Sequence, residues 1–194
     1  MPTQDQRSQA TRDALIDAGL ELFARRGYAD VAVGDIAKAA GVTTGALYHQ
    51  FASKQGLFKA VYDHLVAATG TRIATAREHS DAPSVITDCE AYLDACADPA
   101  FHRIAADGPA VISWDLLVDD MQAFIKASLI AAQDAGEIAE LPIAPVARML
   151  AAALKEAGLM IATADDPIVA RAEASTAARH LLAGLRKPGR GLGL

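Results

Sequence analysis

Glycines and Asp-Pro pairs divide the chain into segments of helix length, and this punctuation constrains the fold more than any other feature. No segment alternates apolar and polar residues over the length of a strand, and alanine, the best helix former, is frequent throughout. Gly27, Gly41 and Gly136 stand where helices should end, and Asp98-Pro99 and Asp166-Pro167 stand where helices should begin. The sequence therefore predicts an all-α protein of about nine helices.

The expected helices follow one another with short links. Gly108-Pro109 is expected to break one helix and open the next, and Pro83 is expected to open another. The predicted helices cover approximately residues 8–26, 33–40, 44–51, 55–77, 83–97, 98–108, 109–135, 146–162 and 167–186.

Composition excludes several classes of protein. Apolar residues make up 52% of the 194 residues and charged residues 22%, which predicts a chain that folds around a core rather than a disordered one. Residues 1–12 are polar, which argues against a signal peptide, and the longest apolar run, residues 149–154, is too short to span a bilayer. We therefore expect a cytoplasmic protein with no membrane partner.

The two cysteines, Cys89 and Cys96, are seven positions apart on one predicted helix. They share a face of that helix but lie too far apart for a disulfide. Buried thiols are the favoured interpretation, and a redox sensor is the alternative.

Charge is distributed unevenly along the chain, whose formal net charge is −6. Residues 1–60 hold seven Lys or Arg and six Asp or Glu, whereas the rest of the chain holds eleven bases and eighteen acids. The acidity therefore belongs to the C-terminal two-thirds. The N-terminal third remains compatible with a local basic surface for nucleic acid.

Residues 33–51 carry the most informative spacing. Two helices of about eight residues are joined by Gly41-Val42-Thr43, where the glycine permits a sharp turn and Thr43 can cap the second helix. Ile36, Ala37 and Leu47 are placed to face inward and fix the angle between the two helices. This arrangement predicts a helix-turn-helix, although helical hairpins without DNA-binding activity can mimic the spacing.

The surrounding sequence is more specific than the spacing. Residues 12–61 resemble the N-terminal DNA-binding domain of TetR family repressors. The matching features are Phe23, Arg26-Gly27-Tyr28, Asp35-Ile36-Ala37, Ala40-Gly41-Val42, Gly45-Ala46-Leu47-Tyr48-His49, Phe51, Lys54 and Leu57-Phe58. The resemblance implies an all-helical homodimer, with a helix-turn-helix domain over residues 1–54 and a divergent effector-binding and dimerisation domain over residues 55–194.

The resemblance also implies roles for individual residues on double-stranded operator DNA. The phosphate contacts of the family fall on Thr43, Tyr48 and Lys54. Its base-edge or close-approach positions fall on Thr44, Gly45 and His49. The alternatives are a packing role for Tyr48 and ordinary surface placement for Lys54 and His49.

The first of the two short helices departs from the family pattern. Val31-Ala32-Val33 stands where members often carry a capping Thr or Ser, and Gly34 stands where a long polar residue often reaches DNA. We expect Arg7, Arg12 or Lys38 to supply phosphate contacts in their place.

The last two predicted helices are rich in small residues, which permit close helix approach and a large apolar contact. In the family that the chain resembles, these helices form a four-helix interface between two copies. A role in covering the domain's own core is the alternative.

An effector pocket is expected among the helices between residues 55 and 135. The candidate lining residues are Tyr62, Tyr92, Phe101, Ile112, Trp114, Met121, Phe124 and, from the following helix, Met160. The polar candidates for orienting a ligand are His102, Arg103, Asp107 and Asp115. Such a pocket suits a small apolar or aromatic molecule, although core packing or surface placement is the alternative for each residue.

Together these features predict a repressor that such a molecule releases from a palindromic operator. A constitutive regulator and an activator are alternatives. A zinc sensor is a further alternative, but the spacing of cysteines and histidines is not that of a known site, and we expect no metal or cofactor. An enzyme is the least favoured, since the sequence contains no HExxH, GxSxG, phosphate-loop or dinucleotide-binding pattern.

Overall fold

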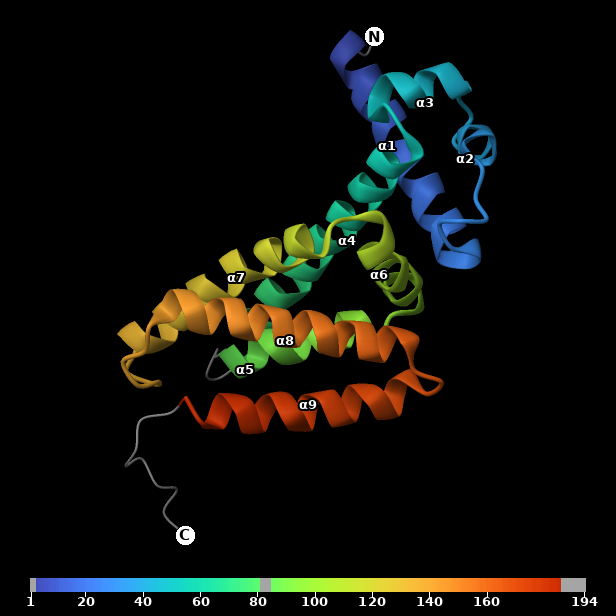
Figure 1. Cartoon of the computed structure of the whole chain (residues 1–194). Coiled ribbons are helices and arrows are strands. Elements are labelled where there is room, and N and C mark those ends of the chain that lie inside the picture. Colours follow the sequence, from blue (N-terminus) through green and yellow to red (C-terminus); the bar gives the residue numbers. More distant parts are fainter. Residues whose placement is uncertain (1–2, 81–84, 186–194) are drawn as a thin grey trace. The chain divides into compact units, whose positions relative to one another are not determined.

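The computed structural model describes residues 3–80 and 85–185, with side chains for all of them except residues 99, 102 and 114–120. The helices of this part of the chain confirm the all-α prediction (Figure 1). They are α1 (Gln4–Arg26), α2 (Val33–Ala39), α3 (Thr44–Phe51), α4 (Lys54–Glu78), α5 (Val85–Cys96), α6 (Pro99–Val111), α7 (Trp114–Asp134), α8 (Ile143–Thr163) and α9 (Pro167–Ala183). None of the described helices is long and apolar enough to cross a membrane.

Side-chain caps set three of the helix starts that the sequence predicted. The side chains of Thr43, Asp98 and Asp166 each accept a hydrogen bond from a backbone N–H in the first turn of α3, α6 and α9 respectively. Helix α1 begins earlier than expected, because Thr3 and Gln6 form a reciprocal capping box ahead of it.

Two predicted helix bounds that lie next to prolines were wrong: the break at Pro109 and the helix start at residue 146. Helix α6 continues through Pro109 to Val111, and α7 begins only at Trp114. Pro109 lies in the last turn of α6, so that only two residues follow it before the helix ends. Helix α8 begins at Ile143 because Pro145 lies in its first turn, where backbone N–H groups need no acceptor within the helix. The predicted helix start at Pro83 and the predicted end near Arg186 lie outside the described residues.

The chain forms two compact units. Unit 1 takes in residues 1–68 and 98–113, and unit 2 takes in residues 69–97 and 114–194, each as far as it is described. The core of unit 1 includes the fully buried Phe23, Ile36, Leu47 and Phe58. Helix α6 packs against α1 in this unit, although the two helices are far apart in the sequence.

Unit 2 is built on the packing of α7 against α8 and of α5 against α8 and α9. An ionic cluster fastens α9 to α5: Glu90 accepts hydrogen bonds from Ser175 at 2.6 Å and from Arg171 and Arg179 at 2.8 Å. Burial alone would raise the pKa of Glu90, but these hydrogen bonds and the two guanidinium charges lower it below its ordinary value. The side chains of α9 thus form specific polar contacts as well as apolar packing.

The link between α3 and α4 contains a strained residue. Ala52 has a φ of 57°, a conformation that costs a residue with a Cβ about 1 kcal/mol or more. Replacing Ala52 with glycine removes this strain but makes the unfolded chain more flexible. We expect Ala52→Gly to raise the free energy of unfolding by about 0.5 kcal/mol, measured by urea denaturation. A lower urea midpoint would contradict this interpretation.

Candidate nucleic-acid interface

Helices α2 and α3 have the geometry that their spacing predicted. Ile36 and Leu47 are fully buried, and Gly41 turns the chain with a φ of +69°. The turn is closed by a hydrogen bond of 2.9 Å from the backbone N–H of Val42 to the carbonyl oxygen of Ala37. These contacts hold α3 at a fixed angle to α2.

The outward face of α3 carries the residues predicted to contact DNA. Thr43, Thr44, Gly45 and His49 are exposed, and Tyr48, at 50% exposure, is the most exposed large apolar residue among the described residues of unit 1. A Cβ added at Gly45 would meet nothing closer than 3.8 Å, so the fold itself does not require a glycine there. A helix N-terminus that carries small and polar residues allows close approach to a phosphate backbone.

Lys54 is partly buried and has contacts within unit 1. Its Nζ lies 3.4 Å from the carbonyl oxygen of Ala29 and 4.3 Å from the ring centroid of Tyr28. Lys54 therefore supports the link between α1 and α2, a role that the sequence did not indicate.

The basic residues expected to assist α2 differ in their surroundings. Ala32 occupies the N-cap position of α2 and provides no side-chain hydrogen bond, which agrees with the predicted loss of a cap. Arg7 and Lys38 are exposed. Arg12 lies over the Phe51 ring at 4.5 Å and donates a hydrogen bond of 3.4 Å to the carbonyl oxygen of Gln50, so it contributes to holding α3 against α1.

Two polar residues proposed from the sequence as ligand contacts have other partners. The carboxylate of Asp107 accepts a hydrogen bond of 2.7 Å from the backbone N–H of Tyr28. Arg103 donates to the carbonyl oxygen of Arg26 at 3.3 Å. These contacts join α6 to the end of α1 and to the residue after Gly27, and the expectation that the two side chains orient an effector stays a prediction. The side chains of His102 and Asp115 lie outside the described part of the molecule.

The apolar effector candidates are divided between the two units. Tyr62, Phe101 and Ile112 are buried in unit 1, whereas Tyr92, Met121 and Phe124 are buried or partly buried in unit 2. Met160 is 60% exposed on α8, and the side chain of Trp114 is outside the described set. A groove in unit 2 is lined by Met160 alone of these candidates, and a smaller cleft in the same unit is lined by none of them.

The larger cavity is an apolar groove between α8 and α9, which lie side by side in Figure 1. It has a volume of about 650 Å³ and is lined mainly by alanine and leucine, with Met160 at one position. Its charged lining residues are the acids Glu156 and Glu173. Seven large apolar side chains are exposed among the described residues, and five of them lie on these two helices: Met149, Met160, Ile168, Val169 and Leu181.

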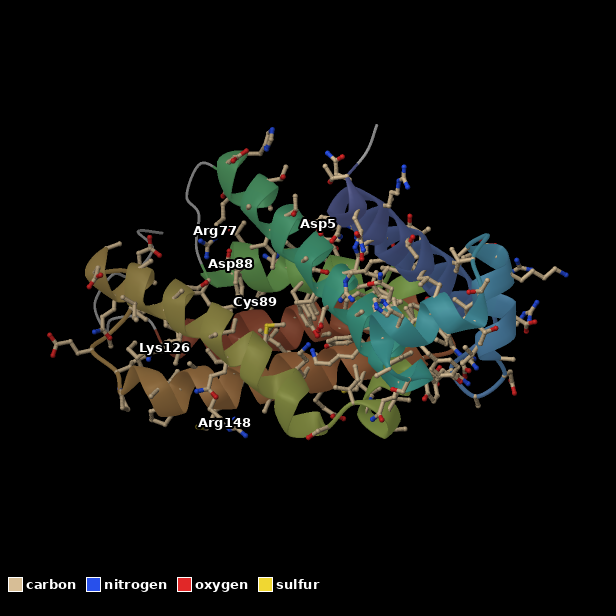
Figure 2. The ribbon with its side chains drawn as sticks, turned by 90° about the horizontal axis from the view of Figure 1, so that it is seen from above. Asp5, Arg77, Asp88, Cys89, Lys126 and Arg148 are labelled. Carbon is tan, nitrogen blue, oxygen red and sulfur yellow. The ribbon has the colours of Figure 1, made fainter. Side chains whose placement is uncertain are left out.

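A buried ionic cluster in unit 2 was missed by the sequence analysis. The carboxylate of Asp88, which is 1% exposed, accepts hydrogen bonds from two nitrogens of Arg77 and from the Ser128 hydroxyl, and Figure 2 shows Arg77 beside Asp88. The hydrogen bond to Asp88 raises the pKa of Arg77 above its ordinary value. A cleft of about 170 Å³ adjoins this cluster. Lys155 on α8 is also buried, with its Nζ 5.7 Å from the Tyr92 ring.

Both cysteines are free, buried thiols, as the sequence predicted. Burial raises the pKa of each to about 12, and the neighbouring carboxylates of Asp88 and Glu90 contribute at Cys89. A protonated, enclosed thiol is a poor nucleophile, which disfavours the redox-sensor alternative. Among the described residues, no three metal-ligating side chains gather at one point.

Two family models match the chain over most of its length. Residues 15–61 match the model for bacterial regulatory proteins of the tetR family. Residues 82–185 match the model for the tetracyclin repressor-like C-terminal domain.

Individual proteins to which the chain is similar are also transcriptional regulators. The chain is 43% identical over 58 residues to the HTH-type transcriptional regulator AcrR of Shigella flexneri, covering 30% of this chain and 27% of AcrR. It is 35% identical over 103 residues to the regulator BetI of Ectopseudomonas mendocina, covering 53% of this chain and 50% of BetI. These matches thus span half or less of the relatives. A solved structure of a TetR-family transcriptional regulator from Pectobacterium atrosepticum is 28% identical, with a TM-score of 0.84, and the match covers 97% of this chain and all of that one.

Proposed function

Because the chain belongs to the TetR family of transcriptional regulators, we propose that it is a homodimeric repressor that binds a palindromic operator through α3 and is released by a small molecule. Regulators of this family are non-enzymatic, in agreement with the expectation that the chain is not an enzyme. The protein is proposed to act in the cytoplasm, where it binds DNA.

The exposed face of α3 is the observation that carries the DNA-binding proposal. Its small N-terminal residues, Thr44 and Gly45, permit close approach to base edges, and His49 lies one turn further along the same helix. Tyr48 and the capping Thr43 are placed to contact phosphates. Two such helices must lie about 34–36 Å apart, or a multiple of that distance, to enter successive major grooves on one face of DNA.

The groove between α8 and α9 supports the proposed dimer. Large exposed apolar surfaces are uncommon on monomeric proteins, and here five large apolar side chains are exposed on the two helices that form an alanine-lined groove, with Met160 and Leu181 in the groove itself. A second copy of the chain would cover the groove with the same two helices, forming a four-helix interface. The proposed functional division is DNA binding by residues 1–54 and effector binding and dimerisation by residues 55–194.

The effector is proposed to be largely apolar or aromatic and to bind in unit 2. Tyr92 on α5 and Met121 and Phe124 on α7 supply bulky side chains with one hydroxyl, which suits such a molecule. A ligand that binds better to the DNA-incompetent form shifts the population towards it. A coupling free energy of about 1–3 kcal/mol changes operator affinity roughly 5–150-fold.

A DNA-binding assay tests this function directly. The purified protein would be titrated against DNA flanking its own gene over a series of salt concentrations. One palindromic footprint, protected at nanomolar protein, is the expected result. Equal binding to all sequences, or no binding by protein that has been unfolded and refolded to remove any bound effector, would contradict the proposal.

Lys54→Ala distinguishes a phosphate contact from a purely structural role for this lysine. Loss of one phosphate contact should weaken binding to all DNA sequences alike and reduce the slope of log K against log salt by about 1. Lys126→Ala removes the same charge from the exposed surface of α7 and should leave the slope unchanged. A weaker affinity with an unchanged slope would mean that Lys54 acts only by supporting Tyr28, without contacting a phosphate.

A further inference from the structure

Helix α9 buries little of its apolar surface within the chain. Its buried residues are Ser175 and Leu182, and the one large apolar side chain of the two, Leu182, lies in the last turn. Helix α8, by contrast, has buried residues from Ala147 to Ala162. Because stabilisation by the hydrophobic effect grows with the apolar area removed from water, burial alone holds α9 weakly and mainly at its C-terminal end.

Three polar side chains form a stripe along one face of α9 and bind a single carboxylate of α5. Arg171, Ser175 and Arg179 follow one another at intervals of four residues, which places them on the same side of the helix. Ser175 and Arg179 donate to Oε1 of Glu90 at 2.6 and 2.8 Å. Arg171 donates to Oε2 of Glu90 at 2.8 Å and also pairs with Asp94 at 2.7 Å. This polar stripe therefore determines which side of α9 faces α5.

The face of α9 next to the polar stripe lines the groove proposed to receive a second copy. Ala170, Ala174 and Ala178 line the groove, and each precedes one member of the stripe by one position. Cys89, which lies next to Glu90 in α5, also lines the groove. Successive helix residues are about 100° apart, so that a rotation of α9 away from Glu90 would carry the three alanines out of the groove. The contact with Glu90 thus sets the surface that α8 and α9 present together.

We propose that Glu90 is a positioning residue for the dimer. By binding the polar stripe, Glu90 fixes the rotation of α9 and its distance from α5, so that α8 and α9 present one surface to a second copy. Without this carboxylate, α9 populates several positions, and the dimer weakens in proportion to the fraction of molecules that match the partner. The inference rests on the proposed function, because the four-helix dimer is part of that proposal.

Glu90→Gln tests the positioning role, since it removes the charge and keeps the size of the side chain and one acceptor oxygen. Glu140→Gln is the matched control, because Glu140 is exposed in the link between α7 and α8 and does not line the groove. We expect Glu90→Gln to raise the dissociation constant of the dimer about 10-fold and Glu140→Gln to leave it unchanged. Sedimentation over a dilution series would give both constants, and circular dichroism would verify that both proteins are helical. Equal dissociation constants would overturn the proposal.

Ser175→Ala tests the same contact from α9. Ser175 is buried and does not line the groove, so its hydroxyl is not placed to contact a second copy, and alanine favours the helix at least as well as serine. We expect Ser175→Ala to raise the dissociation constant about 3-fold in the wild-type background and to change it little further in Glu90→Gln protein. Effects that multiply in the double variant would overturn the proposal. If Glu90→Gln does not fold, an unchanged dissociation constant for Ser175→Ala would overturn it as well.

Failure of this proposal can be separated from failure of the proposed function. If the wild-type protein is monomeric at every concentration, the proposed dimer fails, but the hold of Glu90 on α9 can still be measured by hydrogen exchange. Amides over residues 167–183 should exchange faster in Glu90→Gln than in Glu140→Gln, because α9 has little other burial to protect it. Equal exchange rates in the two variants would overturn the assignment of Glu90.

Discussion

Ala177→Glu is expected to convert the protein from a dimer to a monomer and to weaken operator binding at least about 100-fold. Ala177 is exposed on α9 and lines the groove proposed to receive a second copy. A two-fold interface would bring the new carboxylate into a groove whose charged lining residues, Glu156 and Glu173, are already acidic. A dimer of the variant would bury two new carboxylates, one from each copy, and the residues that line the groove include no cation to pair with them.

Ala172→Glu is the matched control for this dimer prediction. Ala172 is exposed on the same helix but does not line the groove, so that the substitution adds the same charge at a position the proposed interface does not use. Sedimentation would report the mass of each variant, and circular dichroism would verify that both remain helical. A dimeric Ala177→Glu protein with wild-type operator affinity would show that the two copies associate through another surface.

The helix-turn-helix could be predicted closely because its determinants are local. The bounds of α3 are those expected, since Thr43 caps its start and the apolar spacing around Leu47 allows one packing arrangement. Gly27 likewise ends α1. A cap or a turn glycine depends on a few neighbouring residues, and those neighbours can be read directly from the sequence.

The roles of α6 could not be predicted because they depend on contacts distant in sequence. Asp107 and Tyr28 are 79 positions apart, and no periodicity in either segment indicates that they meet. The break expected at Pro109 was wrong for a related reason: proline removes one hydrogen bond, but it does not fix the residue at which a helix ends. The glycines, prolines and caps in the sequence therefore predict where helices lie, but they do not predict which residues those helices contact.

The burial of charged residues could likewise not be predicted from the sequence. Asp88 is one of several acids in the helical segments of the C-terminal two-thirds, and the pattern around it does not distinguish it from an exposed residue. Its burial depends on Arg77 and Ser128, which reach it from α4 and α7.

The effector candidates were chosen by size and aromaticity. These properties suit a packed core as well as a ligand site, which is why the candidates divide between the two units.

Arg77→Ala is expected to lower the free energy of unfolding by about 2 kcal/mol. The substitution removes two of the three hydrogen bonds that side chains in the described part of unit 2 donate to the Asp88 carboxylate, and leaves the Ser128 hydroxyl. An enclosed pair broken in this way typically costs about 3–5 kcal/mol. The smaller figure is expected here because the Arg77 side chain is 40% exposed, so water already screens the pair and can replace part of it.

Lys126→Ala is the matched control for this stability prediction. Lys126 is an exposed cation on α7, and its removal should change the free energy of unfolding by less than about 0.5 kcal/mol. Urea denaturation would give both values. Because Arg77 and Asp88 belong to unit 2 and the face of α3 belongs to unit 1, folded Arg77→Ala protein should keep its operator affinity at low temperature. Equal stability of the two variants would mean that water and Ser128 fully replace Arg77 at the buried carboxylate.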